Sequence, residues 1–277
     1  VDTVKYTNLV VGKEYKLSGK LMNKGTGKAL VVDGKEVTNN VVFTPKQKDG
    51  SVEIKFTLNS SALEDVTTVV FEDLMYKDLV VTTHSDINDE NQSVHFPKLR
   101  THAKDSITGD HVGTLGKTTI VDTVSYNNLI PGKEYTISGK LMNKETGKAF
   151  TVNGKEVTTS KTFTPDKANG TVELVYELDA SALEGKTLVV FEDLYTNGKN
   201  VTSHADINDE DQTVHYPKVR TNSSDIDTKD GVGMVKETTT IKDTVSYWNL
   251  IPGQVYTIKG TVYEKSTKKA VSSEVVK

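Results

Sequence analysis

A long internal repeat constrains the fold of this chain more than any other feature. The stretch VDTVKYTNLVVGKEY at 1–15 returns as VDTVSYNNLIPGKEY at 121–135 and as KDTVSYWNLIPGQVY at 242–256. The first two copies are 120 residues apart, and one extra residue precedes the third. A period of this length is the size of a whole domain and too long for one unit of a solenoid. The sequence therefore predicts tandem copies of one domain.

The predicted seams between the copies lie at Pro97 and Pro217, each of which follows a repeated HFP or HYP block. Proline stops a strand and stiffens a junction. The units are then 1–97, 98–217 and 218–277. Only the middle unit holds every repeated block, because the first lacks a counterpart of 98–120 and the third stops soon after its first predicted hairpin. Since the chain opens inside a predicted strand, we expect it to be a fragment of a longer array.

Within each unit, polar and apolar residues alternate with a period of two, which is typical of half-buried strands. TVELVYEL at 171–178 and KTLVVFEDL at 186–194 are examples, and turn signals such as IPGK and VNGK separate such segments. The one helical hint is DASALEG at 179–185, where Asp179 could cap a single turn. We predict an all-β fold, with tandem Ig-like β-sandwich domains arranged as a rod.

Composition excludes several classes of function. The 277 residues include no cysteine, which excludes disulfides and thiol chemistry, and the net charge of −4 comes without a basic stripe for nucleic acid. Apolar runs are far shorter than the ~20 residues of a membrane-spanning helix. The acidic DINDE blocks lack the glycine and terminal glutamate of a calcium-binding EF-hand loop, so we expect no metal and no cofactor. No G-x-S-x-G or phosphate-loop motif points to an enzyme that turns over.

Two repeated polar features remain to be explained. HSDINDENQ at 84–92 returns as HADINDEDQ at 204–212, with a His eight residues before a Gln. Glu192 and Asp122 interrupt otherwise apolar runs. Such carboxyls are either buried, where a facing pair can share one proton, or turned outward to solvate one face of a strand. The pattern alone leaves both alternatives open.

Taken together, the blocks VVFEDL, HADINDEDQT, KLRT or KVRT, and DTVSYNNLIPGKEYT resemble the VaFE-type repeat domains of Gram-positive surface adhesins. The resemblance spans the middle unit and the visible parts of both neighbours. Domains of that family carry an intramolecular Thr–Gln ester bond. A Thr on the first strand attacks the amide of a Gln on the last strand, a His acts as the base, an Asp–Glu pair sharing a proton polarises the amide, and ammonia leaves.

For the middle unit, the resemblance implies a bond between Thr101 and Gln212. It implies His204 as the base and Asp122 with Glu192 as the carboxyl pair. Thr123 also repeats and is the alternative nucleophile. Thr101 is preferred because it opens the unit just after Pro97 and leaves Asp122 free for the acid position.

The outer units hold only parts of this set. The first has the counterparts Asp2, Glu72, His84 and Gln92, and the third has Thr221 and Asp243. We expect the bonding partners of Gln92 and Thr221 to lie outside this chain, as truncation of a longer array would produce. The alternative is that Gln92 accepts Thr221 of another chain, which would give covalent polymers.

The resemblance implies a structural stalk domain of a Gram-positive adhesin, extracellular and anchored to the cell wall. The crosslinking reaction would run once, so the chain is not expected to be an enzyme. Its expected partners are neighbouring repeats, the cell wall through an anchor outside this fragment and an unidentified host ligand, with no nucleic acid and no membrane. One alternative is a ligand-binding module that uses exposed loops such as TNGKN at 196–200, and a weaker one is a fragment of a surface hydrolase.

Overall fold

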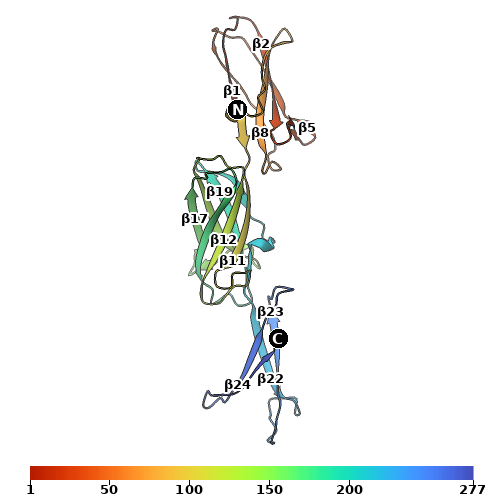
Figure 1. Ribbon diagram of the computed structural model, residues 1–277, viewed down its shortest axis with the longest axis vertical. Coiled ribbons are helices and arrows are strands. Elements are labelled where there is room, and N and C mark those ends of the chain that lie inside the picture. Colours follow the sequence, from red (N-terminus) through yellow and green to blue (C-terminus); the bar gives the residue numbers. More distant parts are fainter. Residues whose placement is uncertain (277) are drawn as a thin grey trace.

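The computed structural model describes residues 1–276, and three all-β units follow one another along its long axis (Figure 1). Within that range there are strands and two short 3₁₀-helices but no α-helix, which confirms the predicted fold class. No helix in residues 1–276 is long and apolar enough to cross a membrane.

The middle unit is a sandwich of two antiparallel sheets. One sheet has the order β11-β12-β18, and the other is centred on β13 and β19 with β14, β17, β20 and β21 paired to them. The elements are β11 (Lys98–Asp105), β12 (Lys117–Asn127), β13 (Tyr135–Asn143), β14 (Lys148–Ala149), β15 (Thr151–Val152), β16 (Lys155–Glu156), β17 (Thr158–Phe163), β18 (Gly170–Asp179), β19 (Thr187–Thr196), β20 (Lys199–His204), η2 (Glu210–Gln212) and β21 (Thr213–His215).

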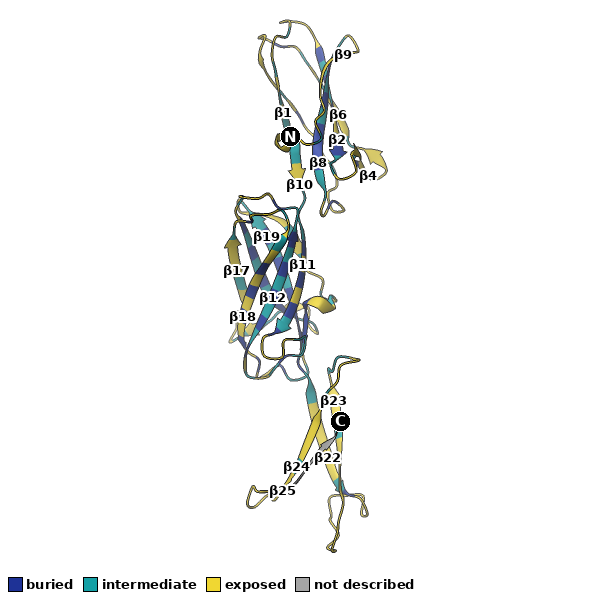
Figure 2. Ribbon diagram, viewed as in Figure 1, coloured by how far each residue is buried: buried dark blue, intermediate teal, exposed yellow. Residues whose placement is uncertain are grey.

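The core of this unit lies between the two sheets, where the period-two patterns of the strands meet. Along β18, buried and exposed residues alternate from Thr171 to Asp179. Ile120 and Leu174 of one sheet are fully or almost fully buried in the same cluster as Ile137 of the other. Burying a side chain of this size contributes roughly 1.5–3 kcal/mol. In Figure 2 the buried stretches of strand, coloured dark blue, are most extensive in this unit.

The first unit repeats this plan without one strand. Its elements are β1 (Asp2–Tyr6), β2 (Tyr15–Asn23), β3 (Lys28–Ala29), β4 (Val31–Val32), β5 (Lys35–Glu36), β6 (Thr38–Phe43), β7 (Gly50–Ile54), β8 (Thr67–Tyr76), β9 (Leu79–His84), η1 (Glu90–Gln92) and β10 (Ser93–His95). β1 pairs with β7 as β12 pairs with β18. Within residues 1–276, no strand lies on the other side of β1 in the place that β11 takes beside β12. The edge of β1 that faces away from β7 therefore has no described strand paired to it.

The third unit consists of two strand pairs, β22 (Lys218–Asp225) with β23 (Ile241–Trp248) and β24 (Ile258–Tyr263) with β25 (Ala270–Val276). β22 and β23 are mostly exposed along their length (Figure 2).

The same asparagine contact joins each unit to the next. Asn128, in the left-handed backbone region at φ 62°, donates its amide to the carbonyls of Val66 (3.0 Å) and Phe96 (3.1 Å) of the first unit. Its counterpart Asn249, at φ 59°, donates to the carbonyls of Lys186 (2.7 Å) and Tyr216 (3.1 Å) of the middle unit.

One local prediction is wrong. The DASALEG segment forms no helical turn, because β18 continues to Asp179 and the chain then makes a hydrogen-bonded turn. The Asp179 carboxylate accepts the backbone N–H of Ser181 at 3.0 Å. The side chain of Asp179 therefore does satisfy a local donor, but in a turn.

Candidate functional site

Thr101 occupies the middle of β11, where alternation turns it toward the core. Leu99, Thr101 and Ala103 are buried on one face of the strand, and Thr101 is only 6% exposed. Its hydroxyl has no hydrogen-bond partner. Burying such a group unpaired costs roughly 1–3 kcal/mol. Buried polar groups are normally paired, so an exception of this kind calls for an explanation.

Gln212 is brought to the same region by the loop after β20. The Asp206 carboxylate accepts the N–H of Asn208 at 2.9 Å, which closes a turn. Asp209 then caps η2 by accepting the N–H of Asp211 at 2.9 Å. The short helix ends with Gln212 fully buried. The acidic, amide-rich composition of the loop thus serves to turn the chain and insert this side chain.

Glu192 and Asp122 form a buried carboxyl pair between the two sheets. Glu192 lies on β19 and Asp122 on β12, and neither is exposed to solvent. Burial is the largest cause that raises the pKa of Glu192 well above its usual range, and the neighbouring charge of Asp122 adds to it. Burial also raises the pKa of Asp122 to about 6, while the contact with Glu192 acts in the opposite direction. At neutral pH the pair therefore holds one proton, mainly on Glu192.

This placement decides between the two alternatives that the sequence left for Glu192. Its side chain points inward, and its carboxyl lies beside both Thr101 and Gln212. Because side chains alternate along a strand, Glu192 and its two sequence neighbours lie on opposite faces of β19. Only the packing of the two sheets determines which of these faces is buried.

The amide of Gln212 is in direct contact with this pair. Its Nε2 donates to Oε2 of Glu192 at 2.8 Å, and its Oε1 has no partner. A protonated carboxyl that polarises the amide must instead donate to Oε1. A half-turn of the amide about its last side-chain bond exchanges the two atoms and places Oε1 next to the Glu192 carboxyl.

His204 has the environment of a neutral base. It ends β20, directly opposite Glu192 in the register of the β19–β20 pair. Burial first, and then the charge of Arg100, lower the pKa of the imidazole. Nε2 lies 3.0 Å from Oδ2 of Asp209, while the buried Nδ1 has no partner. The proton therefore resides on Nε2, and the lone pair of Nδ1 is free to accept another.

Two residues of the site were not anticipated from the sequence. Asp209 holds His204 with one carboxylate oxygen and caps η2 with the other. The sequence did offer one signal for Asp209, since the first unit has an Asp at the same position, Asp89. Tyr176 is almost fully buried on β18, and its hydroxyl packs against Gly139. A Cβ at position 139 would lie only 1.8 Å from that hydroxyl, so no larger residue fits there without a shift. Burial and then the charges of Glu192 and Asp122 raise the pKa of Tyr176.

Thr123, the alternative nucleophile, lies on the other face of β12. Buried and half-buried residues alternate along this strand, so that Asp122 and Val124 face the core and Thr123 does not. In the register with β11, Thr123 is opposite the exposed His102. The geometry thus places Thr101, and not Thr123, beside the Glu192–Gln212 contact.

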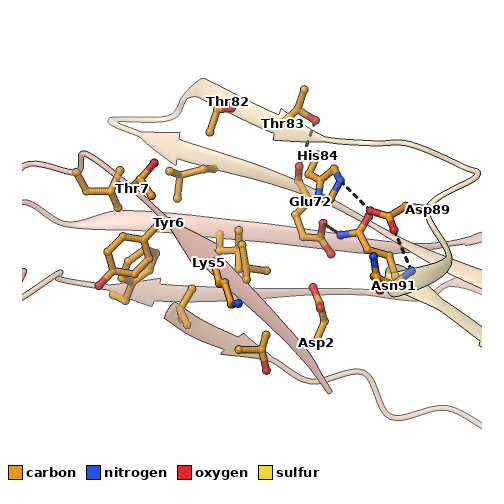
Figure 3. A pocket seen from close by; sticks show the side chains of 18 residues that line it. Asp2, Lys5, Tyr6, Thr7, Glu72, Thr82, Thr83, His84, Asp89 and Asn91 are labelled. Atoms are coloured by element: carbon orange, nitrogen blue, oxygen red, sulfur yellow. Dashed lines mark hydrogen bonds and ion pairs between the residues drawn. The ribbon is translucent and has the colours of Figure 1, made fainter. Parts of the chain in front are cut away.

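The first unit presents the same groups in an open cavity of about 730 Å³. Gln92 Nε2 donates to Glu72 Oε2 at 2.8 Å, and His84 Nε2 lies 3.3 Å from Asp89 Oδ2. Figure 3 shows Asp2 on β1 across from these groups. Burial first, followed by the contact with Asp2, raises the pKa of Glu72 to about 8.

The two copies differ mainly in how far the site is covered. The His84 side chain is 54% exposed, whereas that of His204 is 10% exposed. The strand that carries Thr101 in the middle unit has no described counterpart in the first, which explains the opening.

In the third unit, Thr221 on β22 and Asp243 on β23 are exposed. Thr221 is opposite Val245 in the register, as Thr101 is opposite Val124. Within the described residues, no Gln reaches either side chain. The structure therefore assembles all five predicted groups in the middle unit alone.

Solved structures resemble the chain only weakly. A bacterial adhesin from Mobiluncus mulieris, described as containing intramolecular disulfide, isopeptide and ester bond cross-links, aligns over 55% of this chain and 76% of its own at 13% identity, with TM-scores of 0.38 and 0.37 in two crystal forms. A β-D-mannosidase from Dictyoglomus thermophilum aligns over 88% of this chain and 31% of its own at 10% identity, with a TM-score of 0.32. These TM-scores are too low to support any inference about function. No curated protein sequence matches the chain significantly.

The family comparison, by contrast, covers the entire chain. The sequence model described as "T-Q ester bond containing domain" matches residues 1–96, 97–216 and 217–277. This confirms the resemblance that the repeated blocks indicated. The chain belongs, along its whole length, to the family of T-Q ester bond containing domains.

Proposed function

We propose that the middle unit closes an ester bond between Oγ1 of Thr101 and Cδ of Gln212, and that the chain serves as a crosslinked stalk segment of a bacterial cell-surface adhesin. The observation that carries the proposal is the buried contact of Gln212 with the Glu192 carboxyl, 2.8 Å long, beside an unpaired Thr101 hydroxyl. The fold holds the hydroxyl and the amide together, so their effective concentration is high before any bond forms.

The reaction begins at the hydroxyl. Nδ1 of His204 removes the proton from Thr101, because a Thr hydroxyl is a poor nucleophile until a base assists it. Oγ1 then bonds to Cδ of Gln212, and the negative charge that develops on Oε1 is stabilised by the proton held on the Glu192–Asp122 pair.

The reaction ends with loss of ammonia. The bond between Cδ and Nε2 breaks, and the departing nitrogen takes the proton that His204 had received. One hydroxyl and one amide become one ester and one NH₃, and every side chain except Thr101 and Gln212 returns to its starting state. The reaction runs once per domain, which is self-processing and not enzymatic turnover.

The adhesin role rests on the resemblance of the repeated blocks to VaFE-type domains and on family membership. An extracellular location anchored to the cell wall belongs to the same proposal. Gln212 lies at the end of η2, just before the last strand β21, and not on that strand as the resemblance implied. In a chain without cysteine, an ester between the first strand and η2 would supply the covalent brace that a disulfide supplies elsewhere. The TNGKN loop at 196–200 carries polar side chains and a glycine, and no apolar patch that would favour the alternative of direct ligand binding.

Intact mass spectrometry of the purified chain tests the bond. We expect a deficit of one ammonia, about 17 Da, relative to the sequence mass, since loss of NH₃ accompanies ester formation. Thr101→Ala should restore the full mass, and tandem spectra of the wild type should show a peptide that joins Thr101 to Gln212.

Thr123→Ala is the matched control, because it also removes a Thr hydroxyl, but one on the outer face of the neighbouring strand β12. It should retain the deficit. A wild-type chain of full mass would contradict the proposal, and a deficit abolished by Thr123→Ala alone would move the bond to the other Thr.

A further inference from the structure

A second cluster of chemically competent side chains lies outside the crosslink site, on the surface of the middle unit. His102, His111 and Asp211 each offer one ligand atom, and these atoms lie within 4.8 Å of one another. His102 follows Thr101 on β11 but points to the opposite face, His111 belongs to the loop between β11 and β12, and Asp211 immediately precedes Gln212. We propose that these three residues bind a divalent transition-metal ion, with Zn²⁺ as the best match.

The donor set fits this class of ion. Two imidazole nitrogens and one carboxylate oxygen with a fourth position left to water are a common zinc arrangement, and imidazole also suits Cu²⁺ and Ni²⁺. Zn–N and Zn–O bonds of about 2.0–2.2 Å place tetrahedral ligand atoms about 3.3–3.6 Å apart. The cluster must therefore contract slightly. His102 and Asp211 are exposed and can rotate to do so.

His111 is already oriented as a ligand. Its Nδ1 lies 2.8 Å from the carbonyl oxygen of Thr213, to which it donates its proton. That bond leaves the lone pair on Nε2, and it is the kind of outer contact that fixes the tautomer and the ring of a metal-binding His. The His111 backbone is also fixed, because its carbonyl accepts the N–H of His215 at 2.7 Å.

The two His rings meet edge to face, with their centroids 4.9 Å apart and an interplanar angle of 82°. The two imidazoles are therefore already in contact, and the bond from His111 to Thr213 ties them to the C-terminal end of the domain. Asp211 adds a negative charge, and Asp209 and Glu210 precede it in the chain. Glu210 is paired with Lys144 at 2.6 Å, and Asp209 contacts His204 at 3.0 Å. The carboxylate of Asp211 is therefore the one that favours a cation here.

All three side chains are specific to the middle unit. In the third unit the positions of His102 and His111 are occupied by Asn222 and Gly231, and in the first unit the position of Asp211 is occupied by Asn91. The sister units thus carry other residues at each of these positions. The expectation of no metal rested on the acidic loop alone. Both His ligands come from segments about 100 residues earlier in the chain, and only the fold brings them to this loop.

The consequence is a reversible tie between the two elements that the proposed ester joins. An ion held by β11 and η2 would stabilise the folded middle unit before the covalent bond forms, because a ligand that binds only the folded state raises stability by mass action. The metal site itself does not depend on the ester, so the two proposals can fail separately.

Isothermal titration of Zn²⁺ into the tag-free 277-residue chain tests the site, in parallel with Thr101→Ala. We expect one saturable equivalent in both proteins. His102→Asn and Asp211→Asn carry the residues of the sister units and should fold normally, yet each should weaken Zn²⁺ binding by at least about tenfold, since even loss of an outer contact typically costs 10–100-fold. His111→Gln should do the same.

His95→Gln is the matched control. His95 lies within reach of Glu90 at 3.2 Å, and the middle unit repeats this pair as His215 and Glu210 at 3.1 Å. Its loss should leave Zn²⁺ affinity unchanged. Absence of saturable binding, or binding that survives His102→Asn and Asp211→Asn, would overturn the inference. Binding that persists in Thr101→Ala while the wild type shows no mass deficit would leave the metal site standing and reject the ester.

Discussion

At the scale of single residues, the middle unit concentrates its unsatisfied buried atoms where the proposed chemistry occurs. Buried polar groups are normally paired, and each exception carries a cost in folding free energy. The unpaired side-chain atoms at this site are Thr101 Oγ1, both carboxylate oxygens of Asp122, Tyr176 Oη, Glu192 Oε1, His204 Nδ1 and Gln212 Oε1. A shared proton satisfies the carboxyls, and ester formation removes the unpaired hydroxyl. The reaction therefore relieves part of the cost that the folded, unreacted site carries.

The protonation states of the same residues predict how the rate of crosslinking depends on pH. The pKa of His204 is lowered, so the neutral base persists below its usual range and is lost only when pH falls through that lowered pKa. The pKa of Glu192 is raised, so the proton on the pair is present below that raised pKa and is lost as pH rises through it. The rate should thus be bell-shaped, with its maximum between the two.

This profile can be measured by intact mass as the rate of ammonia loss, starting from chain recovered unfolded before the bond has closed and refolded at a series of pH values. Glu192→Gln removes the ionisable acid and should slow the reaction by about 10²–10⁴-fold, the usual contribution of a general acid. The alkaline limb should disappear with it. A wild-type rate that does not vary with pH would contradict the roles of both residues.

At the scale of elements, the loop from His204 to Gln212 acts as one unit. Asp209 connects its two functional ends, since one carboxylate oxygen orients His204 at 3.0 Å and the other caps η2 at 2.9 Å. The eight-residue spacing between His204 and Gln212 therefore reflects a turn followed by one turn of 3₁₀-helix, and not a continuous strand.

This loop also shows how far sequence reasoning could go. Strands such as β18 were predictable because alternation is a local property of the chain. The inward direction of Glu192, the bridging role of Asp209 and the hydroxyl of Tyr176 were not, because each depends on which segments the sandwich packs together. Tyr176 gave no signal from the repeat either, since the first unit has Phe56 at that position. The prediction of a helical turn at 179–185 was wrong because an Asp side chain caps non-helical turns as readily as helices.

Asp209→Asn tests the bridging role of the loop. The Asn amide can donate to Nε2 of His204, which would force the imidazole proton onto Nδ1 and block the base. Crosslinking should slow by about 10²–10⁴-fold, as for loss of a general base, while the fold and the Zn²⁺ site remain. Asp89→Asn in the first unit is the matched control and should leave the reaction of the middle unit unchanged, as followed by the mass deficit over time.

At the scale of the whole molecule, one asparagine at each junction aligns consecutive units. Asn128→Asp retains the size and the left-handed backbone preference of the side chain but replaces its donor with a charge facing the carbonyls of Val66 and Phe96. The junction should loosen, since burial of unpaired acceptors is unfavourable. Small-angle scattering should then show a broader distribution of long intramolecular distances. Asn8→Asp, at the same place in the first unit, should not change it.

The proposed ester also changes how the chain bears tension, because force enters the middle unit near Thr101 and leaves it near Gln212. The 110 residues between these two positions are bypassed by the covalent bond. In single-molecule stretching from both termini, Thr101→Ala should release this segment on unfolding, a gain in contour length on the order of 360–400 Å at 3.3–3.6 Å per residue. The wild type and Thr123→Ala should show no such step at any force that leaves the ester intact. A wild-type step of that length, in a protein whose mass shows the ammonia deficit, would mean that the bond closes elsewhere than between β11 and η2.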